Sequence, residues 1–152
     1  MNSLKIKLSS IILLLVIFHL SLFFTALDVL AERLSVKSNT ANIRSGPATT
    51  YKVLWQIEKY HPVDVIKKTG NWYQFKDFES DSGWIHKSLL SNMATVITKK
   101  NCNIRSGPGT KYKIAFTAEK GIPLKIIKKK EKWLHVQHAD GDEGWINKPL
   151  VW

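Results

Sequence analysis

The arginine and aromatic side chains that could bind a ligand occur in this sequence as pairs, 61 residues apart. A guanidinium holds carboxylates or carbonyls through its N–H groups, and aromatic rings form the walls of grooves that receive extended peptides. We therefore predict that these residues line ligand grooves, of which one or both are open. The eight residues are Arg44, Tyr51, Trp72 and Trp84, with Arg105, Tyr112, Trp133 and Trp145 as their counterparts. The alternative is structural, because an arginine can clamp its own loop and aromatic rings also fill small cores.

The residues that could act as nucleophiles, bases or metal ligands do not form a catalytic set. Cys102 is the only cysteine, and no histidine or acid is near it in the sequence; it aligns with Ala41 and is predicted to be a small buried residue. His135 and His138 are three residues apart at a strand end, so their side chains should point to opposite faces. We predict no enzymatic activity, no metal and no cofactor. The rival is an enzyme of unrecognised type that uses a histidine or Cys102.

These residues belong to a long internal repeat. The segment NIRSGP occurs at residues 42–47 and again at 103–108, and the same offset aligns the Gly-Trp-Ile segments at 83–85 and 144–146. Between Asn42 and Leu89, 22 of the 48 aligned pairs are identical, and no insertion is needed. We therefore predict two small domains, at residues 34–91 (repeat one) and 95–152 (repeat two).

Each repeat is predicted to be all β, because no segment after residue 31 has a long apolar run at helical spacing. Short alternating segments bounded by turn residues predict five strands in repeat one and five more 61 residues later. In repeat one they are near residues 35–37, 52–58, 63–67, 72–77 and 82–86. Short strands with such turns favour a small β-barrel in each repeat.

Strand alternation divides the side chains into an inner and an outer set. Tyr73, Phe75 and Ile85 are predicted to face the core, as are the residues 61 positions later. Trp72 and Trp84, and likewise their counterparts, are predicted to lie on the outer face or in a groove. This outward position is what makes them candidates for ligand binding.

Several residues between the strands carry predictions about backbone shape. Gly46 and Gly107 are expected to adopt positive φ, a conformation that a side chain penalises. Asn42 is expected to hydrogen-bond to backbone amides of its own turn, as short polar side chains do. These residues are therefore interpreted as structural.

Residues 1–31 have the layout of an export signal. Lys5 and Lys7 precede a stretch with no charged residue from Leu8 to Leu27. We predict cleavage after Ala31 and a location in the periplasm or cell envelope. The alternative is a retained anchor, because about 20 residues is the length that spans a bilayer.

The chain after residue 31 is strongly basic, with 21 basic and 11 acidic residues. Positive charge favours anionic partners, which outside the cytoplasm are peptidoglycan, other anionic envelope polymers or lipid head groups rather than nucleic acid. A membrane is expected as a partner only if the export segment is retained. The alternative is that the charge only keeps the surface soluble. Residues 128–130, all lysines, are predicted to form a solvated turn.

The ordered set of motifs resembles the bacterial SH3-like domain family, in its exported, tandem, proteobacterial form. The set is Asn-Ile-Arg-Ser-Gly-Pro, a tyrosine, Pro-Val or Pro-Leu, a tryptophan, and Gly-Trp-Ile followed by a leucine, and it covers nearly all of both repeats. The resemblance implies small bent barrels that target the cell wall, often by binding peptidoglycan peptides. One departure is Tyr60, where repeat two has Gly121 and the family usually has glycine, so that turn is predicted to be strained or reshaped.

We therefore expect a non-catalytic cell-envelope binding protein that recognises peptidoglycan or its peptides through SH3-like grooves. The alternative is an interaction adaptor whose grooves hold a proline-rich or disordered segment of another envelope protein. A third alternative is that repeat two, or the interface, supports dimerisation instead of ligand capture.

Overall fold

Strands make up most of the regular structure in residues 31–152, the part of the chain that the computed structural model describes. Repeat one contains β1 (Glu32–Val36), β2 (Thr40–Arg44), β3 (Val53–Glu58), β4 (Pro62–Thr69), β5 (Trp72–Lys76), β6 (Ser82–His86), the 3₁₀ turn η1 (Lys87–Leu89) and β7 (Leu90–Ser91). Repeat two contains β8 (Thr95–Ile97), β9 (Cys102–Arg105), β10 (Ile114–Ala118), β11 (Pro123–Lys130), β12 (Trp133–Gln137), β13 (Glu143–Asn147) and the 3₁₀ turn η2 (Lys148–Leu150). The predicted export segment, apart from Ala31, is outside the described residues.

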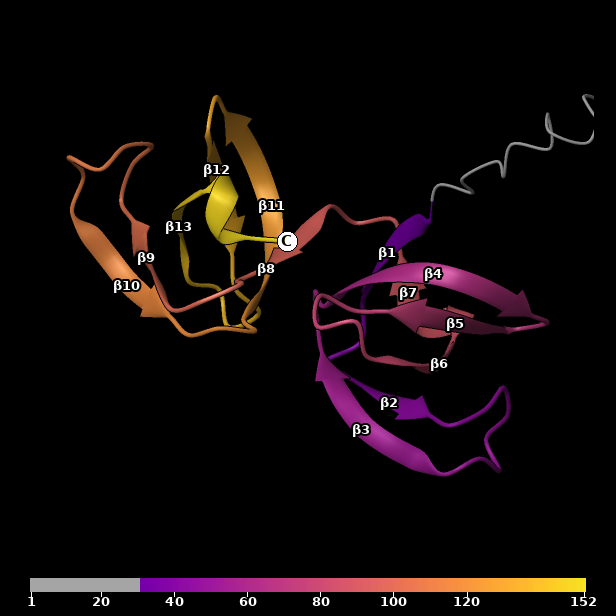
Figure 1. Ribbon diagram of the computed structural model, residues 1–152. Coiled ribbons are helices and arrows are strands. Elements are labelled where there is room, and N and C mark those ends of the chain that lie inside the picture. The colour runs from indigo at the N-terminus through magenta and orange to yellow at the C-terminus, as the bar shows by residue number, and fades with distance from the viewer. Residues whose placement is uncertain (1–30) are drawn as a thin grey trace, which may run out of the picture. The chain divides into compact units, whose positions relative to one another are not determined.

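Repeat one folds as a seven-stranded antiparallel sheet with the order β3-β2-β6-β5-β4-β1-β7 (Figure 1). β4 and β5 form a hairpin in which Thr69 pairs with Trp72, which leaves a two-residue loop. β2 lies beside β6, and this pairing places Arg44 opposite Trp84 although the two are far apart in the sequence. The sheet order therefore brings two of the predicted ligand-binding residues together.

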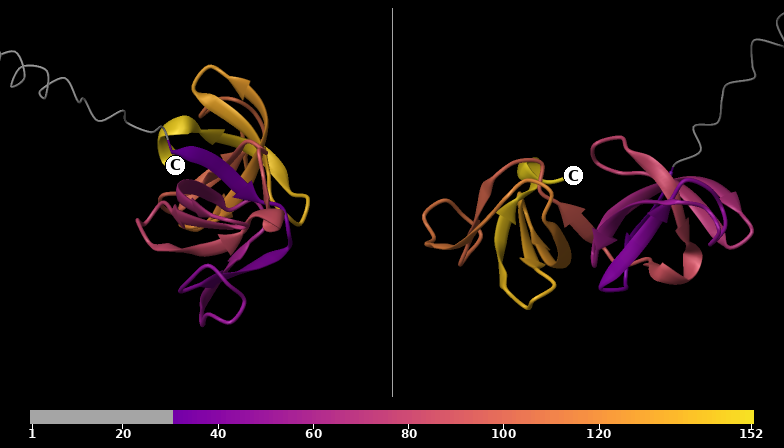
Figure 2. Two further views of the ribbon diagram at one scale, coloured as in Figure 1. Left: turned by 90° about the vertical axis from the view of Figure 1, so that its right-hand side faces the viewer. Right: turned by 90° about the horizontal axis from the view of Figure 1, so that it is seen from below.

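Repeat two has the same arrangement, as a six-stranded sheet with the order β10-β9-β13-β12-β11-β8. Arg105 of β9 again lies opposite Trp145 of β13. A single bridge from Thr98 to Val151 is found where repeat one pairs β1 with β7. In the right-hand view of Figure 2 the indigo to pink strands of repeat one form one group and the orange to yellow strands of repeat two form another.

These pairings confirm that the described part of the chain is all β. They do not record a ladder between the two outermost strands of either sheet within residues 31–152, so the closed barrels stay a prediction. Over the same residues, no helix is both long enough and apolar enough to cross a membrane.

The sequence failed to predict β2 and the two-residue β7 in repeat one, and β9 in repeat two. Residues 42–44 of the NIRSGP segment belong to β2, and residues 103–105 belong to β9. Ile43 and Ile104 are fully buried there, which explains why this polar segment adopts extended structure. The prediction of a turn at residues 128–130 is also wrong, because these lysines lie in β11 and only the hairpin loop after them turns.

Each repeat has its own hydrophobic core. Phe75 and Ile85 are fully buried in repeat one, and Val136 and Ile146 are fully buried at the aligned positions of repeat two. Tyr73 packs against the first core while remaining partly exposed. The inner set predicted from strand alternation is thus confirmed.

Trp84 is the most buried of the four tryptophans predicted for the outer set, with 9% exposed. It is paired with Arg44 of β2 and Gln74 of β5, and cross-strand partners lie on the same face of a sheet. Because neither partner belongs to the hydrophobic core, Trp84 faces away from that core, although its neighbours cover most of it. Trp72, Trp133 and Trp145 are half-buried.

Bulges bring apolar residues to the surface at matched positions of the two sheets. The β4–β5 ladder skips Ile66, and the β11–β12 ladder skips Ile127. Both side chains are largely exposed. A bulge adds one residue to one strand and reverses the alternation beyond it, which explains isoleucines pointing to solvent.

Neither Gly46 nor Gly107 adopts a positive φ. These positions require glycine for a different reason. A Cβ atom on Gly46 would lie 2.4 Å from the ring of Tyr51, and one on Gly107 would lie 2.3 Å from the ring of Tyr112. The positive-φ prediction is wrong: the glycines are needed because a tyrosine ring packs directly on the backbone.

The turn at Tyr60 does show the strain expected from the sequence. Tyr60 has φ 72°, close to the φ of 86° at Gly121 in repeat two. A non-glycine residue in this region costs of order 1 kcal/mol. The two repeats thus keep one turn shape, and in repeat one the buried tyrosine side chain helps to offset the strain.

Candidate functional site

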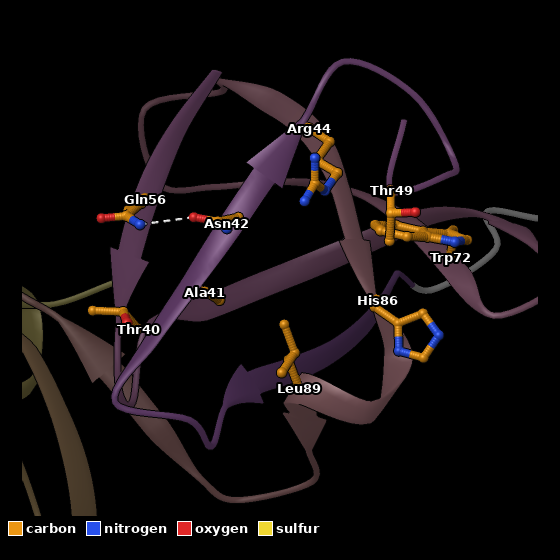
Figure 3. A pocket seen from close by; sticks show the side chains of 9 residues that line it. All are labelled: Thr40, Ala41, Asn42, Arg44, Thr49, Gln56, Trp72, His86 and Leu89. Atoms are coloured by element: carbon orange, nitrogen blue, oxygen red, sulfur yellow. Dashed lines mark hydrogen bonds between the residues drawn. The ribbon is translucent and has the colours of Figure 1, made fainter. Parts of the chain in front are cut away.

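A cleft of about 410 Å³ opens on repeat one and collects side chains from β2, β3, β5, β6 and η1 (Figure 3). It is lined by Thr40, Ala41, Asn42, Arg44, Thr49, Gln56, Trp72, His86 and Leu89. We call it the polar cleft. Figure 3 shows Arg44, Thr49, Trp72 and His86 grouped on one side and Thr40, Asn42 and Gln56 on the other.

An aromatic pair forms one wall of the polar cleft. The rings of Trp72 and His86 meet edge to face, with centroids 5.2 Å apart and an interplanar angle of 78°. His86 Nδ1 accepts a hydrogen bond from the backbone N–H of Ser88 and is 2.7 Å from the Ser88 hydroxyl. The neutral ring therefore carries its proton on Nε2, which is a donor for a ligand acceptor.

Arg44 supplies positive charge to the polar cleft and also holds the loop that follows β2. Its Nη1 donates to the backbone carbonyl of Tyr51 at 2.8 Å. This single bond leaves other guanidinium N–H groups for a carboxylate or carbonyl ligand. Arg44 thus has the structural role that the sequence left open, and its ligand-binding role stays a prediction.

The opposite wall is made of amide side chains. Gln56 Nε2 donates to Asn42 Oδ1 at 2.7 Å, from β3 across to β2 (Figure 3). Asn42 therefore bonds to a neighbouring strand, and the predicted contact with backbone amides of its own turn is wrong. With Arg44 and His86, this wall makes the polar cleft rich in hydrogen-bond donors and flanked by one indole.

Only part of the predicted set of site residues meets in the polar cleft. Arg44 and Trp72 line it, whereas Trp84 is buried beside it in the sheet. Tyr51 is 47% exposed and packs on Gly46, outside the cleft lining. The clearest residue that the sequence analysis missed is His86. The one sequence pattern that could have identified His86 is strand alternation, because the residue after the buried Ile85 must point outward.

In repeat two the loop clamp is kept but the cleft is different. Arg105 Nη1 donates to the carbonyls of Thr110 and Tyr112, at 3.0 and 2.8 Å. Tyr112 is exposed, like Tyr51. Trp145 stacks on His135, with centroids 4.9 Å apart and an interplanar angle of 25°.

The cavity of repeat two that corresponds most closely to the polar cleft has about 400 Å³ and does not include Trp133. Its lining includes Cys102, Asn103 and Thr117 from β9 and β10. Asn147 and Pro149 replace His86 and Ser88 of repeat one. Repeat two therefore lacks the imidazole of this wall, although it keeps a tryptophan at the position of Trp72.

Cys102 is free and half-buried, where the sequence analysis expected full burial. Burial raises the pKa of its thiol, and nearby Lys100 acts in the opposite direction. A raised pKa leaves less of the reactive thiolate. Across residues 31–152, histidine, cysteine and acidic side chains form no group of three or more that could hold a metal ion.

Curated relatives of this chain carry cell-wall amidase names. The chain is 24% identical over 155 residues to a putative N-acetylmuramoyl-L-alanine amidase, YrvJ, of Bacillus subtilis (strain 168), which covers 93% of this chain and 30% of the relative. It is 40% identical over 48 residues to a probable cell wall amidase, LytH, of Staphylococcus epidermidis, which covers 31% of this chain and 16% of the relative. The chain therefore spans less than a third of the length of these relatives.

Among solved structures, similar chains include an NlpC/P60 family protein from Bacillus cereus ATCC 10987, with a TM-score of 0.40 and 14% identity over 80% of this chain and 56% of that one. NlpC1 from Trichomonas vaginalis matches with a TM-score of 0.36 and 12% identity over 80% of this chain and 45% of that one.

The family described as bacterial SH3 domain matches the sequence at residues 37–92 and again at residues 98–152. The two matches follow the two sheets and together cover most of the chain. This protein is therefore a member of the bacterial SH3 domain family and carries two copies of the domain in tandem.

Proposed function

We propose that this protein is a non-catalytic cell-envelope binding protein that recognises peptidoglycan, or its peptides, through the polar cleft of repeat one. The observation that carries the proposal is the grouping of Arg44, Trp72 and His86 around one opening of about 410 Å³. Family membership supports it, because the curated relatives named above are cell-wall amidases that share this portion. In this proposal each sheet curls into a small barrel and the protein is exported to the envelope.

The chemistry of the polar cleft suits a short peptide that carries carboxylates. Arg44 and the Nε2–H of His86 can bind carboxylate or carbonyl oxygens, and charge-assisted bonds of this kind are the stronger ones. The indole of Trp72 can cover the apolar part of the same ligand. Asn42 and Gln56 provide both donors and acceptors for peptide groups.

Net charge supports an anionic partner for the whole chain. Residues 32–91 contain nine basic and six acidic residues, and residues 92–152 contain twelve basic and five acidic residues. Repeat two thus carries most of the excess positive charge. In our proposal repeat two increases attraction to the anionic wall, and repeat one supplies specific recognition.

The test is co-sedimentation of the full chain with purified sacculi, at low salt and at 0.5 M salt. We expect saturable binding that persists at 0.5 M salt, where the Debye length is only a few ångströms, and that falls about tenfold in Trp72→Ala. The matched control is Trp133→Ala, which should bind like the unchanged protein. Absence of binding in both buffers, or equal losses in the two variants, would refute recognition by the polar cleft.

A second candidate is an adaptor that holds a proline-rich or disordered segment of another envelope protein. It is favoured by the exposed apolar side chains of Tyr51, Val53 and Leu54, which occur on or just before the edge strand β3. An edge strand can pair with an added peptide strand. Tyr51→Ala separates the two candidates, since it removes an adaptor contact but leaves the residues of the polar cleft in place.

A further inference from the structure

A second cleft, of about 380 Å³, has the opposite charge to most of the protein. We call it the acidic cleft. Its lining includes four carboxylates, from Glu58, Asp77, Glu79 and Asp81, and no lysine or arginine. Residues 32–91 contain only six acidic residues in all, so two thirds of them line this one cavity.

Two aromatic rings lie among the carboxylates, those of Trp55 and Phe78. Aromatic faces attract ammonium groups through the ring quadrupole, and carboxylates attract them through charge. The combination is a cation-binding environment on a chain whose charge otherwise favours anions. It therefore requires a different ligand from that of the polar cleft.

The protein's own Lys120 shows which kind of cation fits. Residues 31–152 form one compact unit, within which Lys120 of repeat two reaches the loop between β5 and β6. Its Nζ lies 2.5 Å from Glu79 Oε1 and 5.8 Å from the ring centroid of Phe78. A primary ammonium on an alkyl chain thus already contacts one carboxylate and one ring of the cleft.

His61 provides a second and independent indication of a ligand. Its side chain is 8% exposed and lines the acidic cleft, and its Nε2 has no hydrogen-bond partner. Its ring is 6.3 Å from that of Phe78. Burial lowers the pKa of His61 to about 4, so at neutral pH the imidazole is uncharged and does not repel a cation.

The carboxylate of Asp77 shapes the acidic cleft. Asp77 Oδ1 accepts hydrogen bonds from the backbone N–H groups of Glu79 and Asp81, both at 2.9 Å. These bonds fix the loop that carries the carboxylates of Glu79 and Asp81. Burial raises the pKa of Asp77, although the two backbone bonds act in the opposite direction.

We propose that the acidic cleft binds a primary alkyl ammonium of an external ligand, such as the side-chain amine of a diamino acid in a peptide, and that Lys120 competes for the same place. This site goes beyond the proposed function, because it is separate from the polar cleft and selects the opposite charge. An approaching amine displaces the Lys120 ammonium from Glu79 and meets Phe78 and His61 in turn.

Repeat two has no equivalent of this site. The positions of His61, Asp77 and Phe78 are occupied there by Ile122, His138 and Ala139. Asp140, the counterpart of Glu79, bonds instead to His138 Nδ1 at 2.8 Å. Asp140→Asn is therefore a matched control that removes one exposed carboxylate away from the acidic cleft.

The test is an NMR titration of the full chain with Nα-acetyl-L-lysine N-methylamide at low salt, followed at the indole N–H of Trp55. We expect a saturable shift, and none with the Nε-acetylated form of the same probe. Glu79→Gln should weaken binding about fivefold, the upper range for an exposed ion pair, and Lys120→Met should strengthen it. Asp140→Asn should leave it unchanged.

Glu79→Gln and Lys120→Met both change exposed side chains, and they are expected to change the affinity for the lysine probe in opposite directions. Loss of folding would weaken binding in both variants and so cannot produce this pattern. The proposal is overturned if the lysine probe causes no saturable shift, or if the acetylated probe binds equally well. It is also overturned if Lys120→Met weakens binding, or if Glu79→Gln and Asp140→Asn have the same effect. Sacculus binding by the polar cleft is measured separately and does not depend on these outcomes.

Discussion

The two repeats have the same strand order but offer different surfaces. In repeat one, His86 is held by Ser88 and faces a cleft that reaches Trp72. In repeat two the corresponding residues are Asn147 and Pro149, and the nearest equivalent cavity does not reach Trp133. The residues that the repeats share thus mainly fix strands and loops, while the residues that differ change the lining of the cavity in each repeat.

The loop clamp and the acidic cleft show the same contrast between residues that the repeats share and residues that differ. The loop clamp of Arg44 is reproduced by Arg105, including the bond from Nη1 to the carbonyl of the following tyrosine. By contrast, His61 and Phe78 of the acidic cleft are replaced in repeat two by Ile122 and Ala139. The two repeats therefore share the loop clamp but not the lining of this cleft.

The largest expected difference between the repeats is in core packing. Phe75 and Val136 occupy the same position, and both are fully buried. Phe75→Ala should lower the free energy of unfolding by about 4 kcal/mol, and Val136→Ala by about 2 kcal/mol, because more apolar volume is lost in the first. Urea unfolding of the full chain measures both. Equal losses would mean that the two cores do not differ in the way their side chains indicate.

The next effect concerns acid. Burial lowers the pKa of His61 to about 4, below its ordinary value of 6.5, so the folded state binds fewer protons than the unfolded state between these values. Stability is therefore complete above pH 6.5 and falls as the pH drops to 4, by about 3 kcal/mol. The raised pKa of Asp77, also caused by burial, offsets part of this loss, because it favours proton uptake by the folded state.

His61→Ile tests this acid sensitivity, since isoleucine is the residue that repeat two has at the same position. Urea midpoints between pH 7 and pH 4 should fall less in the variant than in the unchanged protein. His138→Gln, which alters a partly exposed histidine of repeat two, serves as a control. A variant that remains as acid-sensitive as the unchanged protein would show that His61 is not the cause.

A smaller effect is expected at the hairpin loops. Gly70 and Glu131 are aligned and have φ of 57° and 53°, and a Cβ on Gly70 would meet no atom within 4 Å. Gly70→Ala should therefore cost about 1 kcal/mol from backbone strain alone, and Glu131→Gly should gain a similar amount. Thermal or urea unfolding measures the change in the free energy of unfolding for each variant. If both variants change it in the same direction, backbone strain at positive φ is not the cause.

The smallest effect is expected on binding by the polar cleft. His86→Asn gives repeat one the residue of repeat two and should weaken sacculus binding about threefold, the loss of one hydrogen bond. Asn147→His should give no gain, because Pro149 has no backbone N–H to hold the imidazole as Ser88 does. Binding curves with purified sacculi measure both variants. A gain in Asn147→His would show that the supporting N–H is unnecessary.

Some features of the fold could be read from the sequence with little ambiguity. Alternation identified Phe75 and Ile85 as core residues, because side chains in a strand point to alternate faces whatever the rest of the fold. The motif order predicted the family, which the two matches confirm. The tyrosine at position 60 predicted a strained turn, because the aligned residue of repeat two is Gly121.

Other features were missed because they depend on neighbours in space. Strand β2 was not predicted, since its polar residues resemble a loop until β3 and β6 supply partners on both sides. Alternation placed Trp84 on the outer face, but it could not show that neighbouring side chains leave only 9% of this residue exposed. Gly46 is needed because the ring of Tyr51 packs on its backbone, and local sequence patterns do not reveal this contact between two loop residues.

The sequence by itself determined the duplication, the β class, the inner faces of the strands and the excess of positive charge, because each follows from spacing or composition. Only the tertiary structure decided which side chains share a cleft. Arg44, Trp72 and His86 come from three strands, and the carboxylates of the acidic cleft come from a strand and a loop. Sheet order and loop geometry bring them together, and no periodicity along the chain encodes that proximity.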